Sequence, residues 1–351
     1  MAETTASTPS SGWLATVNLV ARLLRRPDIG ALLGTIAVFL LFSYFATKNG
    51  NRWVSWADAA QWTDTSAQYG IVAVPVALLM IGGEFDLSAG VMVGSTGLLL
   101  GYLGTYLHMN IWPAILLVLV FGALVGLLNG VIVMGTKLPS FIVTLGTFFI
   151  LQGLNAALTL KVTNSTAIEN IDSTSGFNSA YRWFSSTVWS PYDFKVKVIW
   201  WFVLTVLGAW LLARTRFGNW IFAVGGDAVA ARNSGVPVVR TKIVLFMMTS
   251  ATAALLGIIE ALELRSAQAG EGIGREFYFI ISAVVGGCLL TGGYGSVVGA
   301  TFGAAILGMG SIGIIFAAWD TNWTYTYLGA ILMMAVLLNT VIRARAQRWR
   351  S

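Results

Sequence analysis

Long runs of apolar residues alternate with short polar segments along almost the whole chain. A hydrocarbon core of about 30 Å takes about 20 helical residues, and most of these runs approach that length. The pattern predicts the following apolar segments. They lie at about 30–47, 67–83, 88–107, 112–134, 139–160, 196–213, 242–262, 277–291, 296–316 and 323–342. We therefore expect an all-α polytopic membrane protein with about ten transmembrane helices.

The composition is typical of a chain that lies mostly within a lipid bilayer. Hydrophobic residues make up 56% and charged residues 10%, against roughly 25% charged residues in soluble domains. The net charge is +6, but the basic residues are dispersed between apolar segments, which argues against a nucleic-acid partner. His108 is the only histidine and Cys288 the only cysteine, so neither a multi-histidine metal site nor an intrachain disulfide is expected.

The distribution of basic residues predicts the orientation in the membrane. Ten crossings place both termini on one side, and one set of segments carries most of the Lys and Arg residues. That set contains Arg22, Arg25, Arg26, Lys137, Arg214, Arg216, Arg232, Arg240, Lys242, Arg343, Arg345, Arg348 and Arg350. The positive-inside rule makes it cytoplasmic. We expect cytoplasmic tails at 1–28 and 343–351 around a permease domain at 29–342, with a cytoplasmic loop at about 214–241 and a periplasmic segment at about 161–195.

Two glycine pairs border apolar segments that are short for a membrane crossing. Gly82-Gly83 and Gly292-Gly293 predict helices that break inside the membrane, where the freed backbone must face protein or a cavity. Asp86 and Ser88 follow the first pair and are expected to cap the next helix. A proton or cation site at Asp86 or at the neighbouring Glu84 is the alternative, as in an ion-coupled secondary transporter.

The two glycine pairs also form a weak internal echo. Gly90 and Gly94 follow the first pair, and Gly299 and Gly303 follow the second. If each half of the chain contributes five helices, an odd number, the halves must have opposite orientations. Inverted repeats of this kind are common in transporters.

The loop at 214–241 contains the signature of a short, separately capped helix. Asp227 is suited to the N-cap, alanines follow, Gly235 fits the C′ position and Pro237 stops the helix. Such a helix, from Gly226 to Gly235, could transmit force to a soluble partner. It could also be a connector between two membrane spans.

Other polar residues within the apolar segments admit two interpretations each. Gln152 and Asn155 could hydrogen-bond a polyhydroxylated ligand in a central path, or they could hold one helix to another. Glu260 and Glu263 end an apolar segment near the expected outer face and are interpreted as solvated interfacial charges. A phosphate-binding loop needs Gly-Lys followed by Ser or Thr. The chain has no Gly-Lys pair, so we expect no cofactor on this chain and ATP on another subunit.

Four stretches together resemble the permeases of ribose, xylose, arabinose and galactose-type ABC importers. Gly82–Gly90 resembles the GG-x-DLS-x-G signature of that family, and Leu138–Thr147 resembles its P-x-FIVTLGT segment. Ala223–Lys242 is similar to its AxGGNxxAARxSGI stretch, and Ala283–Gly308 to VIGGTSLxGGxGSVxG. Two departures are visible, because Asp227 stands where the family often has Asn and Glu84-Phe85 fills a position usually taken by one residue.

The resemblance implies the partners and the transport reaction. It implies a homodimer or a heterodimer with a similar permease, cytoplasmic ATPase domains that bind ATP and Mg²⁺, and a periplasmic sugar-binding protein. It also implies that the capped helix seats in the ATPase. Its expected coupling residues are Gly226, Asp227, Ala231, Arg232, Ser234 and Gly235.

The expected substrate is a monosaccharide or similar polyol, carried across the bacterial inner membrane by alternating access with no covalent step. Related permeases for nucleosides, branched-chain amino acids and quorum-sensing sugars share parts of these motifs. The sequence also leaves open an ion-coupled secondary transporter and a membrane scaffold without transport.

Overall fold

A computed structural model describes residues 27–348, and most of them are helical. The principal helices are α2 (Pro27–Lys48), α3 (Trp56–Ile81), α4 (Ala89–Gly101), α5 (Ile111–Thr136), α6 (Ser140–Thr163), α8 (Val196–Arg214), α11 (Val238–Leu264), α12 (Arg275–Val285), α13 (Val297–Phe316) and α14 (Trp323–Arg348). Each predicted apolar segment falls on one of them. Among the described residues, seven of these helices are long and apolar enough to cross a membrane. The chain is a multi-pass membrane protein.

Two predicted segment boundaries were wrong. The second segment is not short, because α3 begins at Trp56 and has 26 residues. Ser55 caps its start by accepting a hydrogen bond from the Asp58 N–H at 3.3 Å, and this turn of polar residues hid the helix from a hydropathy pattern. The eighth segment is shorter than predicted, since α12 ends at Val285 after 11 residues.

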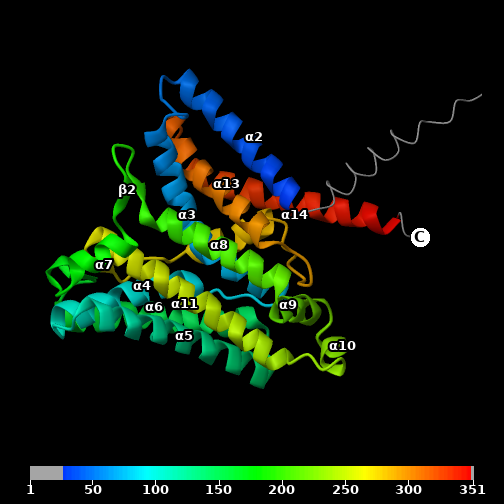
Figure 1. Ribbon diagram of the computed structural model, residues 1–351, viewed down its shortest axis with the longest axis horizontal. Helices are drawn as coiled ribbons and strands as arrows, with labels where there is room; N and C mark the ends of the chain where they lie inside the picture. Colours follow the sequence, from blue (N-terminus) through cyan, green and yellow to red (C-terminus); the bar gives the residue numbers. More distant parts are fainter. Residues whose placement is uncertain (1–26, 349–351) are drawn as a thin grey trace, which may run out of the picture.

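Close backbone approaches determine how the helices pack. α5 lies along α11 (Figure 1) through glycines four residues apart. A Cβ at Gly122 would stand 2.7 Å from Ala254 Cβ, and one at Gly130 would stand 2.9 Å from Ile243 Cα. α13 packs against α2 and α3 on the other side of the bundle. Small residues permit this packing where lipid supplies no hydrophobic drive between helices.

Residues 164–195 fold into a cap over one end of the bundle. The cap contains β1 (Ala167–Ile168), a 3-10 turn η2 (Ile171–Ser173), α7 (Phe177–Phe184) and the hairpin of β2 (Thr187–Trp189) and β3 (Phe194–Lys195). β1 pairs antiparallel with β4 (Ala267–Gln268) of the loop after α11. The Ser185 hydroxyl donates to the Ile259 carbonyl at 2.7 Å. We call this end the cap end; α4 reaches it through a π-helical turn, η1 (Tyr102–Tyr106).

The opposite end carries α9 (Arg216–Gly226) and α10 (Ala228–Asn233), and we call it the coupling end (Figure 1). Both glycine-pair breaks lie there, because the Gly293 N–H donates to the Ile81 carbonyl at 2.8 Å and a Cβ at Gly292 would stand 2.9 Å from the Gly225 carbonyl oxygen of α9. Equivalent points of two inverted halves would lie at opposite ends. The glycine echo therefore does not mark an inverted repeat, and the inversion of the halves stays a prediction from the helix count.

The predicted tails fall mostly outside the described residues. Residues 1–26 and 349–351 of these tails lie outside the described part of the chain. α2 begins at Pro27, within the predicted N-terminal tail, and α14 continues to Arg348, beyond the boundary predicted at 342.

Candidate coupling site

The loop at the coupling end contains two helices where one was predicted. The Thr215 hydroxyl caps α9 by accepting from the Gly218 N–H at 3.1 Å. Asp227 ends α9 and starts α10, because one carboxylate oxygen accepts the Val229 and Ala230 N–H groups at 2.9 and 3.0 Å. The Asp227 cap was therefore predicted correctly. Its position makes α9 and α10 separate elements joined by a single residue.

The predicted coupling residues divide into a buried and an exposed side of α10. Ala231 is buried against Val224 and Val238, whereas Arg232 and Ser234 are exposed. Gly235 takes φ +82°, a left-handed conformation that favours glycine, and its N–H donates to the Arg232 carbonyl at 3.0 Å. One side of α10 thus holds it to the bundle and the other faces outward.

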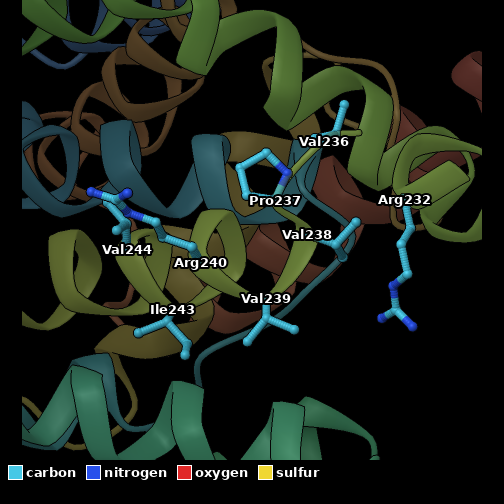
Figure 2. Close-up of a pocket in the computed structure, with 8 residues that line it drawn as sticks. All are labelled: Arg232, Val236, Pro237, Val238, Val239, Arg240, Ile243 and Val244. Carbon is cyan, nitrogen blue, oxygen red and sulfur yellow. The ribbon is translucent and has the colours of Figure 1, made fainter. Parts of the chain in front are cut away.

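A groove of about 520 Å³ lies where α10 leads into α11. Figure 2 shows Arg232 and Arg240 on either side of a run of apolar side chains. Those apolar residues are Val236, Pro237, Val238, Val239, Ile243 and Val244. The groove and the exposed side of α10 together offer a partner a positively charged rim around an apolar surface.

Beneath α9, three glycine pairs meet through their backbones. A Cβ at Gly225 would overlap the Ile81 carbonyl and stand 2.7 Å from the Gly293 nitrogen. A Cβ at Gly292 would stand 2.7 Å from Gly83 Cα, and one at Gly293 would stand 2.8 Å from Gly226 Cα. We call Gly82-Gly83, Gly225-Gly226 and Gly292-Gly293 the glycine junction. It joins the end of α9 directly to the end of α3 and to the loop between α12 and α13.

An ion pair also connects the start of α11 to the segment that follows Gly82-Gly83 of the glycine junction. Lys242, in the second turn of α11, pairs with Glu84, which follows the glycine junction. Both side chains are largely buried. Since Glu84 is occupied by this lysine, the structure gives it a role in holding two segments together.

Residues 84–88 are also hydrogen-bonded to α6. The Ser140 hydroxyl accepts from the Phe85 N–H, and the Thr144 hydroxyl accepts from the Leu87 N–H, each at 3.0 Å. Ser140 and Thr144 are spaced one helical turn apart, so both face this loop. The segment that resembled P-x-FIVTLGT therefore supplies hydroxyls to the backbone of the segment that resembled GG-x-DLS-x-G.

Asp86 is the centre of a buried polar network. Its carboxylate accepts the Ser88 N–H at 2.9 Å and the Ser88 hydroxyl at 2.6 Å, and Ser250 lies 3.4 Å away. The Asn129 amide donates to the Ser88 hydroxyl at 3.0 Å and accepts from Thr147 at 2.6 Å. Ser88, not Asp86, occupies the N-cap of α4, and its side chain makes no capping bond. Asp86 thus stabilises the start of α4 although it lies two residues before the N-cap.

The predicted path residues lie apart from the coupling site, on α6. Asn155 is 8% exposed, and its side-chain nitrogen has no hydrogen-bond partner among the described residues. It lines a cavity of about 440 Å³ with Ser95 and Thr159 and with mainly apolar neighbours. Gln152, about one turn earlier, is partly buried.

Sequence reasoning missed several residues of this site. Thr215 followed by Phe217, Ile221 and Val224 carries a cap and a helical spacing of apolar residues, which together could have revealed α9. Gly225 lies in the stretch that resembles AxGGNxxAARxSGI, but no local signal predicts what its backbone contacts. Its importance comes from a close approach to a carbonyl 144 positions earlier in the chain.

The structure defines a polytopic helical membrane protein whose capped loop at one end is joined by backbone contacts to two broken helices. Residues 58–337 match the family described as branched-chain amino acid transport system / permease component. The chain belongs to this permease family.

Curated relatives agree with the family match over most of the chain. The inner membrane ABC transporter permease protein YjfF of Escherichia coli K12 is 31% identical over 88% of this chain and 91% of its own length. The ribose import permease protein RbsC of the same strain is 31% identical over 87% and 92%. The galactose/methyl galactoside import permease protein MglC is 32% identical over 78% and 84%. No solved structure matches the chain.

Proposed function

We propose that this chain is the membrane-spanning permease subunit of an ABC importer that moves a monosaccharide or similar polyol across the bacterial inner membrane. The family match covers residues 58–337, and relatives are named as import permeases for ribose and for galactose or methyl galactoside, and as a transport permease for xylose. The chain catalyses no covalent step. ATP and Mg²⁺ are bound by a separate cytoplasmic ATPase, with a second permease copy and a periplasmic binding protein completing the assembly.

The glycine junction is the observation that carries the mechanism. A push on α10 reaches α9 through Asp227, and α9 meets the end of α3 and the loop between α12 and α13 backbone to backbone at the glycine junction. Where backbones touch without intervening side chains, no side chain can shift to absorb a movement, because packed interiors transmit displacement. Movement of α10 by the ATPase would therefore shift α3 and the α12–α13 loop together, which opens one face of the path and closes the other.

The residue roles follow from this arrangement. Asp227, Ala231 and Gly235 keep α10 a discrete helix, Arg232 and Ser234 face the ATPase, and Gly226 belongs to the glycine junction. The coupling end is cytoplasmic, both termini lie on that side, and about ten helices cross the membrane. Gln152 and Asn155 contribute hydrogen bonds to the path.

The test is uptake by membrane vesicles that contain the permease, its ATPase and its binding protein. We expect accumulation of D-ribose, D-xylose or D-galactose that requires ATP and is indifferent to proton and sodium ionophores. Uptake driven by an ion gradient without the ATPase would show that the chain is a secondary transporter. A lack of any solute movement under both conditions would favour a scaffold.

A further inference from the structure

A second polar cluster lies toward the cap end of the bundle, away from the coupling site. It brings together Tyr69 of α3, Glu260 of α11, Arg275 and Tyr278 of α12, and Ser311 of α13. Glu260 is four residues from the end of α11, and Arg275 is the first residue of α12, so the cluster is near the cap end. Glu260 is buried, which corrects its interpretation as a solvated interfacial charge, and the other members are partly exposed.

The ion pair in this cluster is neutral and has unused donors. Arg275 Nη1 donates to both carboxylate oxygens of Glu260, at 2.6 Å to Oε2. The Arg275 side chain is 29% exposed and the Glu260 side chain 4%. Among the described residues, the other guanidinium nitrogens have no hydrogen-bond partner. Arg275 is thus anchored by one nitrogen and keeps its remaining donors available for a ligand.

The two tyrosines add an aromatic surface beside these donors. Their rings stack with centroids 4.7 Å apart and an interplanar angle of 26°. The Tyr69 hydroxyl lies 3.5 Å from Ser311 Oγ. Within the described part of the chain the Tyr278 hydroxyl has no partner, and its ring is partly exposed. Aromatic area, three hydroxyls and an arginine therefore gather within one small region.

This combination is costly on a surface that faces lipid. Ionisable side chains within membrane segments face the bundle interior or a water-filled cavity. Nearby, the apolar residues Ile281, Leu307 and Leu328 form a packed cluster against the same tyrosines, so the polar groups stand at its edge. A partly exposed polar edge between membrane helices is typical of a wall along an aqueous passage.

The charges select among possible ligands. The Arg275–Glu260 pair sums to zero, and the carboxyl group of Glu271 lies close to Glu260, so the site has no net positive charge with which to hold an anion. Hydroxyl groups can donate and accept, and the C–H faces of a sugar ring can pack against an aromatic ring. A neutral polyhydroxylated solute matches all these groups, whereas a carboxylate or phosphate does not.

We propose that Tyr69, Arg275, Tyr278 and Ser311 form a recognition point where a neutral polyol contacts the permease after it enters from the cap end. This inference rests on the proposed importer function. It assigns solute binding to residues of α3, α12 and α13, in addition to the α6 residues of the proposed path.

The first experiment measures concentration-dependent uptake of D-ribose, D-xylose and D-galactose by the full complex with Tyr278→Ala. Loss of one aromatic contact of about 1 kcal/mol raises the half-saturating concentration by roughly fivefold, while ATP hydrolysis by the complex is unchanged. Tyr278→Phe keeps the ring and retains most of the affinity. Tyr44→Ala is the matched control, since Tyr44 also contacts an aromatic ring, that of Phe45, but lies outside the cluster and outside the cavity lined by Asn155.

Unchanged uptake by Tyr278→Ala, or an equal loss in Tyr44→Ala, overturns the proposal. A second measurement does not depend on transport. Ser311→Cys in the purified full chain should react with a membrane-impermeant thiol reagent and be protected by millimolar D-ribose, D-xylose or D-galactose but not by L-leucine. The native Cys288 is fully buried. If Ser311→Cys is not labelled, or if none of these sugars slows its labelling, the recognition point is refuted even if ATP-driven uptake succeeds. If the sugars protect Ser311→Cys but ATP-driven uptake fails, only the importer function is refuted.

Discussion

At the scale of single residues, Lys197 shows how a charge is accommodated inside this bundle. Its side chain is fully buried at the cap end, where Nζ lies 2.8 Å from an Asp64 oxygen and 2.9 Å from a Glu263 oxygen. These carboxylates come from α3 and α11, and Lys197 belongs to α8. One ammonium group therefore joins three helices that are distant in sequence.

Replacing this lysine should destabilise the protein strongly. Lys197→Met leaves two carboxylates close together without a counter-charge, and removal of one partner of a buried pair costs about 3–5 kcal/mol. Lys195→Met is the control, because Lys195 is 27% exposed and 3.8 Å from Glu263. We expect a large fall in the thermal unfolding midpoint in nanodiscs for the first variant and a small one for the second. Equal midpoints would show that the ion pairs of Lys197 contribute little.

Glu271 predicts a dependence of stability on pH. Burial, and then the nearby carboxylate of Glu260, raise the pKa of Glu271 to about 7, although Arg275 opposes the shift. Because the folded-state pKa lies above the ordinary glutamate value of 4.5, the protonated form favours the fold. This contribution is complete below the unfolded-state pKa and is lost as pH rises through about 7.

The measurement compares thermal unfolding at about pH 5 and about pH 8.5 for the native chain and Glu271→Gln. The native midpoint should fall with rising pH. The glutamine variant, which cannot ionise, should lose most of that fall. An identical pH profile in both proteins would mean that other groups account for it.

At the scale of elements, the glycine junction makes a sharp prediction about coupling. Gly225→Ala would place a methyl group against the Ile81 carbonyl and 2.7 Å from the Gly293 nitrogen. Backbone atoms cannot rotate away as a side chain can, so α9 must separate from α3. We expect ATP hydrolysis to continue while uptake falls about tenfold or more, a loss of roughly 1.4 kcal/mol or more in coupling.

Gly135→Ala is the matched control for that variant. Gly135 also lies at the coupling end, in the last turn of α5, and a Cβ there would meet nothing within 4 Å. It should transport normally, and its helix should gain slightly from alanine. If the ratio of solute moved to ATP hydrolysed is equal in the two variants, the glycine junction does not transmit the movement.

Element boundaries show where local patterns suffice and where they fail. Asp227 and Gly235 were correctly placed from their residue types, since caps depend on atoms within a few positions. The start of α3 was missed because its first turns are polar, although Ser55 offers a cap. α9 was missed for a similar reason, as its apolar residues are too few for a membrane-length run.

At the scale of the whole molecule, the proposed topology can be measured directly. Arg232, on α10 at the coupling end, and Ser173, in η2 at the cap end, are both exposed. In a chain carrying Arg232→Cys, an impermeant thiol reagent should react only after the cytoplasmic face is opened. Ser173→Cys should react from the outside of intact cells. The reverse pattern would place the ATPase-facing helix outside the cell and exclude the proposed mechanism.

Local sequence patterns were sufficient for the approximate place of the apolar segments, the cap at Asp227 and the family resemblance. These depend on composition and on neighbours within a few residues, which a linear pattern contains. The tertiary structure alone decided that the three glycine pairs meet, that Lys197 unites three helices, and that Glu260 is buried against Arg275. Such contacts join residues dozens or hundreds of positions apart, and the packing of the helices decides which of them meet.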